Sequence, residues 1–171
     1  MDFAKPSNEE GWANQAKKFF DDCHWEPAKN AYERAGKHQA ASVADAYLKR
    51  ERARQIPSEG RGKERVTACT CAANAFELCA QNAADESTNK KYLKLSANCL
   101  EEGNNIQVRR AADLYRDINC VSDAARLYRK LQKFDEIYDI ITKSDKTLTA
   151  TIPDPIKNAT RLYFISKKSY V

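Results

Sequence analysis

The sequence predicts an all-α protein in which about nine helices form a right-handed superhelical stack of antiparallel pairs, an α-solenoid. Two observations support this prediction. Large and small apolar side chains alternate between Trp12 and Ala35 in the order and spacing of a helical hairpin, and one hairpin cannot bury its own apolar face. Stretches rich in Ala, Lys, Glu, Arg and Leu favour helix, whereas Val is scarce, so extensive sheet has little support.

The first two helices make the clearest pair. The first helix is expected to start at Ser7 or Asn8, with Ser7 capping its free amides, and to end near Cys23. Pro27 falls in the first turn of the second helix, where its missing N–H costs nothing, and Gly36 marks the end of that helix. Small residues let the two helices approach closely, and large residues fill the remaining space. The expected core of this hairpin is Trp12, Ala16, Phe19, Ala28, Tyr32 and Ala35.

Helical periodicity continues beyond the first pair. A third helix is expected over 40–56, and it ends before Pro57. Two glycines and a proline within 57–62 predict an internal loop. A fourth helix is expected up to residue 83, and a fifth over 87–102. Because apolar periodicity resumes directly after the loop, 57–62 is not a domain boundary.

The last third of the chain contains a short repeat. The segment Ala111-Ala-Asp-Leu-Tyr115 recurs as Ala124-Ala-Arg-Leu-Tyr128 after thirteen residues, about one short helix and its turn. Another helix is expected around 134–141, then a connector over 144–155 and a last helix from residue 156. The last helix resembles one half of a pair, so we expect 1–171 to be a single α-solenoid domain and a fragment of a longer chain. Further expected core residues are Tyr47, Phe76, Tyr115 and Tyr128.

Three motifs together resemble a known family: Trp12-x3-Ala16-x2-Phe19, Ala28-x3-Tyr32-Glu-Arg-Ala-Gly36 and Ala124-Ala-Arg-Leu-Tyr-Arg-Lys-Leu. They are similar to the tetratricopeptide (TPR)-like region that follows the motor in UvrD-like helicases of the TPR and ankyrin repeat-containing protein family. The resemblance implies a scaffold segment of a helicase-like protein whose ATPase lies elsewhere in a larger polypeptide. The phosphate-binding motif G-x-x-x-x-G-K-[ST] is absent from the sequence.

Enzymatic and metal chemistry find little support in the residues. The six cysteines fall mostly on apolar faces and include no C-x-x-C spacing, which favours reduced core thiols over a zinc site. Paired carboxylates such as Asp21-Asp22 fall at helix ends, where neighbouring side chains diverge. We therefore expect no catalytic, cofactor-binding or metal-binding residues and no cofactor.

Positive charge is concentrated over 49–65, within a chain of net charge +5. Two interpretations stay open: a solvated helix end and loop, or a patch that attracts phosphates with an affinity that falls as salt rises. The function expected first is a non-catalytic protein–protein interaction scaffold, and the alternative is an accessory nucleic-acid-binding surface. The candidate basic patch consists of Lys49, Arg50, Arg52, Arg54, Arg61, Lys63 and Arg65.

The expected partner is a protein or peptide of unknown identity. No apolar run approaches the roughly 20 residues that cross a bilayer, and residues 1–10 are polar, unlike a signal peptide. We therefore expect no membrane partner and an intracellular location, cytoplasmic or nuclear. A monomer is expected, or a weak dimer formed through the terminal apolar helix.

Overall fold

The computed structural model describes residues 8–57, 59 and 62–168, and in this part of the chain every regular element is a helix. The helices are α1 (Glu9–Asp21), α2 (Trp25–Arg34), α3 (His38–Gln55), α4 (Gly62–Gln81), α5 (Glu86–Glu101), α6 (Asn105–Asp117), α7 (Val121–Lys130), α8 (Phe134–Lys143), α9 (Lys146–Ala150) and α10 (Asp154–Lys168). The all-α prediction is confirmed for these residues.

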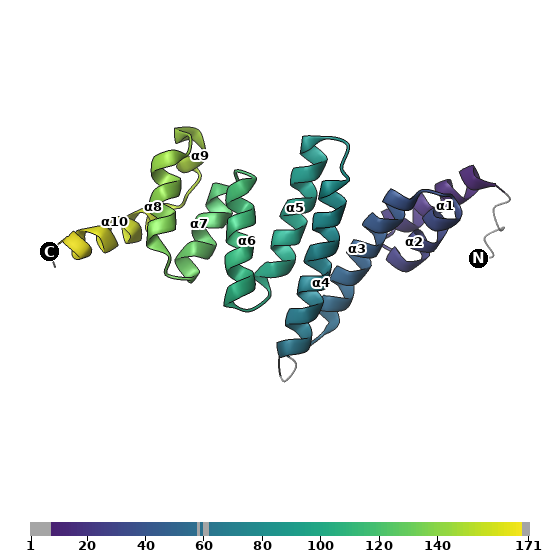
Figure 1. Ribbon diagram of the computed structural model, residues 1–171, viewed down its shortest axis with the longest axis horizontal. Coiled ribbons are helices and arrows are strands. Elements are labelled where there is room, and N and C mark those ends of the chain that lie inside the picture. Colours follow the sequence, from purple (N-terminus) through teal and green to yellow (C-terminus); the bar gives the residue numbers. More distant parts are fainter. Residues whose placement is uncertain (1–7, 58, 60–61, 169–171) are drawn as a thin grey trace. The chain divides into compact units, whose positions relative to one another are not determined.

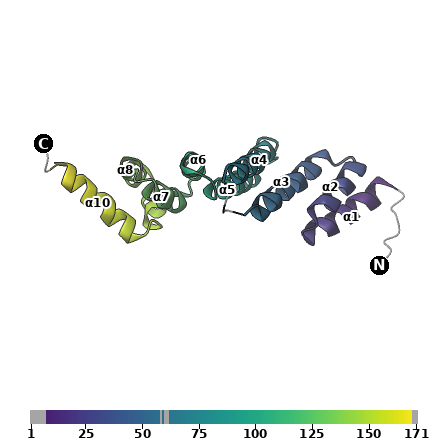
Figure 2. The same cartoon turned by 90° about the horizontal axis from the view of Figure 1, so that it is seen from below.

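The chain forms two compact units, Met1–Cys99 and Leu100–Val171, and the boundary lies in the last turn of α5. In the first unit α1 packs on α2, α2 on α3 and α3 on α4 (Figures 1 and 2). In the second unit α7 lies between α6 and α8, while α9 and α10 pack on α7 and α8. The single α-solenoid domain and its right-handed superhelix stay predictions.

Four interhelical turns share one backbone geometry. Each contains one residue with a positive φ angle of 57° to 65°, namely Cys23, Gly36, Asn119 and Gln132. The next residue donates its N–H to the carbonyl of an aromatic residue five positions earlier, at 2.8 to 2.9 Å: His24 to Phe19, Lys37 to Tyr32, Cys120 to Tyr115 and Lys133 to Tyr128. This is the Schellman arrangement, in which a left-handed residue ends one helix and lets the chain reverse.

The turns impose a thirteen-residue period in both units. Phe19 and Tyr32 are thirteen residues apart, as are Tyr115 and Tyr128. Cys23 and Gly36 correspond to Asn119 and Gln132, each 96 residues further along the chain. The repeat seen in the sequence at 111–128 therefore has a counterpart in the first unit.

Alanines make up a large share of the buried core. A residue without atoms beyond Cβ lets two backbones approach, and its burial costs no side-chain entropy. The alanines with no exposed surface are Ala16, Ala28, Ala44, Ala46, Ala72, Ala73, Ala97, Ala111, Ala112, Ala124 and Ala125.

The large residues expected in the core differ in burial. Phe76, Tyr115 and Tyr128 are fully buried, as are the small residues Ala16, Ala28 and Ala35. Four others are half-buried: Trp12, Phe19, Tyr32 and Tyr47. The Arg34 guanidinium lies 4.7 Å from the Trp12 ring centre, so a cation covers a ring that the core does not enclose.

The ends of several helices differ from the sequence prediction. Asn8 caps α1 by accepting the Gly11 N–H at 2.8 Å, whereas Ser7 lies outside the described residues. The expected loop 57–62 is shorter, because α4 begins at Gly62.

The expected connector 144–155 is not free of helix. It contains the five-residue helix α9, which Asp145 caps by accepting the Thr147 N–H at 2.8 Å. The helix α10 also begins inside this segment, because Pro155 falls in its first turn, where proline is tolerated. Ten helices are therefore present among the described residues, against about nine expected.

Replacing Gly36 with alanine tests the turn geometry. An added Cβ would meet no atom within 4 Å, so its cost comes from the positive φ of 65°. We expect the free energy of unfolding in urea to fall by about 1 kcal/mol. The control Gly62→Ala, at the start of α4 and equally free of contacts, should leave stability unchanged or slightly higher. Equal stability of Gly36→Ala and the wild type would contradict the left-handed conformation assigned to Gly36.

Candidate functional site

Several side chains of the candidate basic patch have partners within the first unit. The Lys49 Nζ lies 2.7 Å from Asp45, and the Arg52 guanidinium lies 3.4 Å from Glu26. Arg50 stacks over the Tyr47 ring at 4.8 Å. These contacts offset part of the positive charge that the sequence places between 49 and 65.

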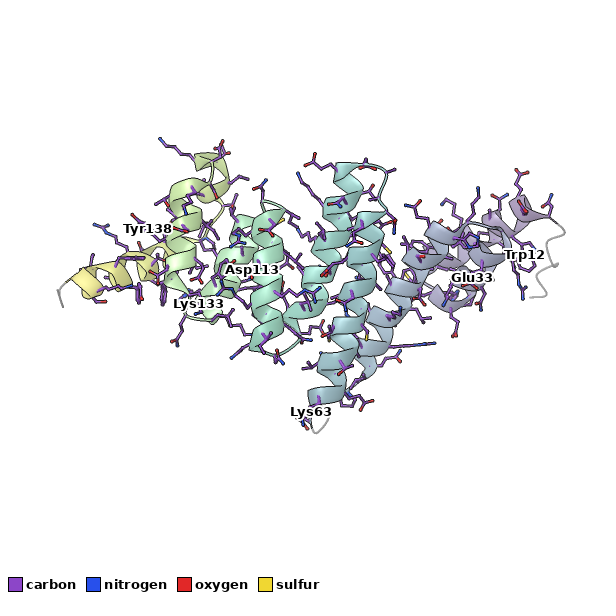
Figure 3. The ribbon with its side chains drawn as sticks, viewed as in Figure 1. Trp12, Glu33, Lys63, Asp113, Lys133 and Tyr138 are labelled. Atoms are coloured by element: carbon purple, nitrogen blue, oxygen red, sulfur yellow. The ribbon has the colours of Figure 1, made fainter. Side chains whose placement is uncertain are left out.

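The remaining patch residues lie at the end of α3 and the start of α4. Arg65 donates to the Ile56 carbonyl at 2.9 Å, and Arg54 is exposed. Lys63, at the start of α4, is also exposed (Figure 3). Arg61 lies outside the described residues. Several described members are engaged in different contacts, and the single basic patch stays a prediction.

Asp45 is the centre of an ion-pair cluster between α2 and α3. Its carboxylate accepts from Lys29 at 2.9 Å and from Lys49 at 2.7 Å. Burial raises the pKa of Asp45, but the hydrogen bonds from the two lysines outweigh this effect and the net pKa is lowered. The cluster lies along an open groove of about 320 Å³ between α2, α3 and α4, with both polar and apolar walls.

Two buried tyrosines of the second unit donate hydrogen bonds to carboxylates on neighbouring helices. The Tyr115 hydroxyl donates to Glu101 at 2.6 Å, and Arg126 pairs with the same carboxylate at 2.9 Å. Burial and the hydrogen bond to Glu101 raise the pKa of Tyr115. One carboxylate thus connects the end of α5 with α6 and α7.

The second tyrosine repeats this arrangement one helix further along. The Tyr128 hydroxyl donates to Asp113 at 2.5 Å, and burial together with this bond raises the pKa of Tyr128. The Arg109 guanidinium lies 5.5 Å from the Tyr128 ring centre and pairs with Glu136 of α8 at 2.9 Å. This cluster joins α6, α7 and α8, and its role is structural.

The candidate binding site is an apolar groove between α8 and α10. It has a volume of about 310 Å³. Tyr138 of α8 faces α10, and its ring centre lies 4.7 Å from that of Phe164 (Figure 3). The groove is lined by Tyr138, Ile141, Lys157, Thr160, Arg161, Phe164 and Ile165.

Large apolar side chains of this region are open to solvent. Tyr138 is 49% exposed and Ile165 is 52% exposed, and Leu162, three residues before Ile165 on α10, is 65% exposed. Apolar residues clustered at one exposed site mark interaction surfaces more often than singly exposed ones do. The sequence predicts an exposed terminal helix but not these groove residues, because their proximity depends on how α10 packs on α8.

The cysteine and histidine side chains form no recognisable chemical site. All six cysteines are free thiols, and Cys69, Cys79 and Cys99 are buried. Burial raises the pKa of the Cys79 thiol, which lowers its nucleophilicity at neutral pH. Within the described ranges no three His, Cys, Asp or Glu side chains are placed to hold a metal ion.

Comparison with family models, with curated proteins and with solved structures gives no match to this chain. None of the described helices is both long enough and apolar enough to span a bilayer.

The tyrosine–carboxylate pairs predict a loss of stability at alkaline pH. A tyrosine in the unfolded chain titrates near 10.0, and the folded pKa values of Tyr115 and Tyr128 are higher. Their contribution is therefore complete below about pH 10 and declines above it, because the unfolded state loses these protons first. We expect the double variant Tyr115→Phe/Tyr128→Phe to lose less unfolding free energy than the wild type between about pH 9 and about pH 11.

Urea unfolding at each pH, with tyrosinate absorbance recorded in parallel, measures this difference. The control Tyr163→Phe changes a tyrosine of α10 outside the two clusters and should keep the slope of the wild type. Identical slopes for all three proteins would show that the two hydroxyl groups are not held in these hydrogen bonds.

Proposed function

We propose that this chain is a non-catalytic protein–protein interaction scaffold built of TPR-like helical pairs. The observation that supports the proposal is the apolar groove between α8 and α10, whose side chains are half exposed although large enough to fill a core. Leaving such side chains in water forgoes roughly 25 cal/mol for each Å² that a partner could cover. A protein segment with its own apolar side chains would recover that free energy.

The second unit provides the support for such a surface. The turn before α8 and the Tyr128 cluster fix α8 against α6 and α7, and α10 packs on α7 and α8, so the groove side chains are positioned before a partner arrives. The resemblance to a region that follows a helicase motor is consistent with an accessory role in a larger protein. In that context the motor would supply the catalysis and this region would hold a partner.

Nucleic-acid binding through 49–65 is the second candidate function. It depends on cations that attract phosphates, and Lys49 and Arg52 already lie beside carboxylates. These pairs favour the protein-binding proposal, because each carboxylate also repels a phosphate that approaches its partner.

A capture experiment with the full chain as bait tests the proposal. We expect cellular proteins to be retained by the wild type and lost on Ile165→Glu, which places a charge in the apolar groove. The control Ile106→Glu alters a residue of α6 that is already 81% exposed, and it should retain the same proteins. Retention that is unchanged by Ile165→Glu, or no enrichment over empty resin, would contradict a binding role for the groove.

The same preparation separates the two functions. Fluorescence anisotropy with labelled single-stranded DNA at low and high salt should show no binding at either concentration. Binding at low salt that disappears on Arg52→Glu/Lys63→Glu would instead support the nucleic-acid alternative.

A further inference from the structure

We infer that the α8–α10 groove takes an amphipathic helix of a partner protein whose apolar face is bordered by carboxylates. This inference rests on the proposed function and adds the chemistry of the partner. Its evidence is an apolar floor combined with two cations, and no carboxylate, among the described residues that line the groove.

The side chains that line the groove have helical spacing on both walls. Tyr138 and Ile141 lie one turn apart on α8. On α10 the lining residues recur at three- and four-residue steps: Lys157, Thr160, Arg161, Phe164 and Ile165. Large side chains at such spacing are complementary to those at i, i+3, i+4 and i+7 of an amphipathic helix, the usual pattern for helix-in-groove binding. The floor therefore suits a helical ligand better than an extended polar one.

Two cations accompany the apolar residues at the groove. Lys157 and Arg161 lie one turn apart on α10, about 6 Å along its axis. Lys157 is 3.6 Å from Asp154, whose side chain is largely in solvent, so that pair is weak. Arg161 is exposed and has no ion pair among the described residues. The groove lining itself includes no carboxylate.

The acidic residues of α8 are already paired with other cations. Asp139 lies 2.8 Å from Lys143, and Glu136 lies 2.9 Å from Arg109. Asp135 lies 3.6 Å from Lys167 of α10, and this exposed pair is weak, like that of Lys157 with Asp154. The described residues that line the groove include two cations and no carboxylate, so the charge at the groove is positive, and a ligand with carboxylates one turn apart complements it.

Two synthetic helical peptides with the same leucine face provide the test. One carries glutamates beside the leucines, and the other carries lysines at the same positions. Titrated by anisotropy against the full chain, the glutamate peptide should bind at least about fivefold more tightly than the lysine peptide.

Variants connect this preference to the groove. Arg161→Glu should weaken binding of the glutamate peptide by about fivefold and strengthen binding of the lysine peptide, since it reverses one charge at the groove. Ile165→Glu should abolish binding of both peptides. The control Arg129→Glu reverses an exposed cation of α7 outside the groove lining and should change neither affinity.

Three outcomes would overturn the inference. Equal or tighter binding of the lysine peptide would refute the acidic partner while leaving the scaffold proposal intact. If neither peptide binds, but Ile165→Glu still abolishes retention of cellular proteins in the capture experiment, a helical acidic ligand would be refuted and protein binding would not. A dimer in sedimentation analysis that dissociates on Ile165→Glu would identify a second copy of this chain as the occupant.

Discussion

The four Schellman turns are the constraint on which the rest of the structure depends. In each of them a left-handed residue lets an N–H return to the carbonyl of an aromatic residue, and this closes one helix and sets the start of the next. The turn fixes the exit angle and keeps the connection to three residues. Neighbouring helices consequently lie antiparallel, and alanines such as Ala28 and Ala124 can meet the adjacent backbone.

The same aromatic residues connect the turns to the interior. In the second unit the backbone carbonyl of Tyr128 accepts the turn N–H, while its side chain is buried and its hydroxyl reaches Asp113 on the preceding helix. One residue thus contributes to helix termination, to apolar burial and to polar cross-linking. In the first unit Tyr32 has the equivalent backbone role, but its ring is half-buried and packs against Phe20 at 6.4 Å. The Schellman hydrogen bond is therefore common to both units, whereas the side-chain contacts of the aromatic residue differ.

The sequence predicted the helical class, most helix positions and the thirteen-residue repeat. These features depend on local periodicity and on residues that mark helix ends, such as Pro27 at a start and Gly36 at a stop. The left-handed turns at Cys23 and Gln132 were not predicted, since these residue types rarely adopt positive φ and give no compositional signal. The short helix α9 was missed because five residues are too few for a periodic pattern.

The candidate site was less predictable than the fold. A run of basic residues is visible in sequence, but the acidic partner of Arg52 is Glu26, on a different helix. The groove between α8 and α10 depends on packing that brings Tyr138 beside Phe164, 26 residues away. Sequence spacing within each helix gave the apolar faces, and only the tertiary arrangement shows which of them stays open to a partner.

Hydrogen exchange resolved to single amides tests the turn constraint most directly. If the account is correct, the amides of Lys37, Cys120 and Lys133 exchange as slowly as those in the middle of the adjoining helices, because each donates to a buried or half-buried aromatic residue's carbonyl. The first-turn amides that follow them, which have no intrahelical acceptor, should exchange much faster. Exchange of the three turn amides at the rate of an unstructured peptide, with the helices still protected, would contradict the account.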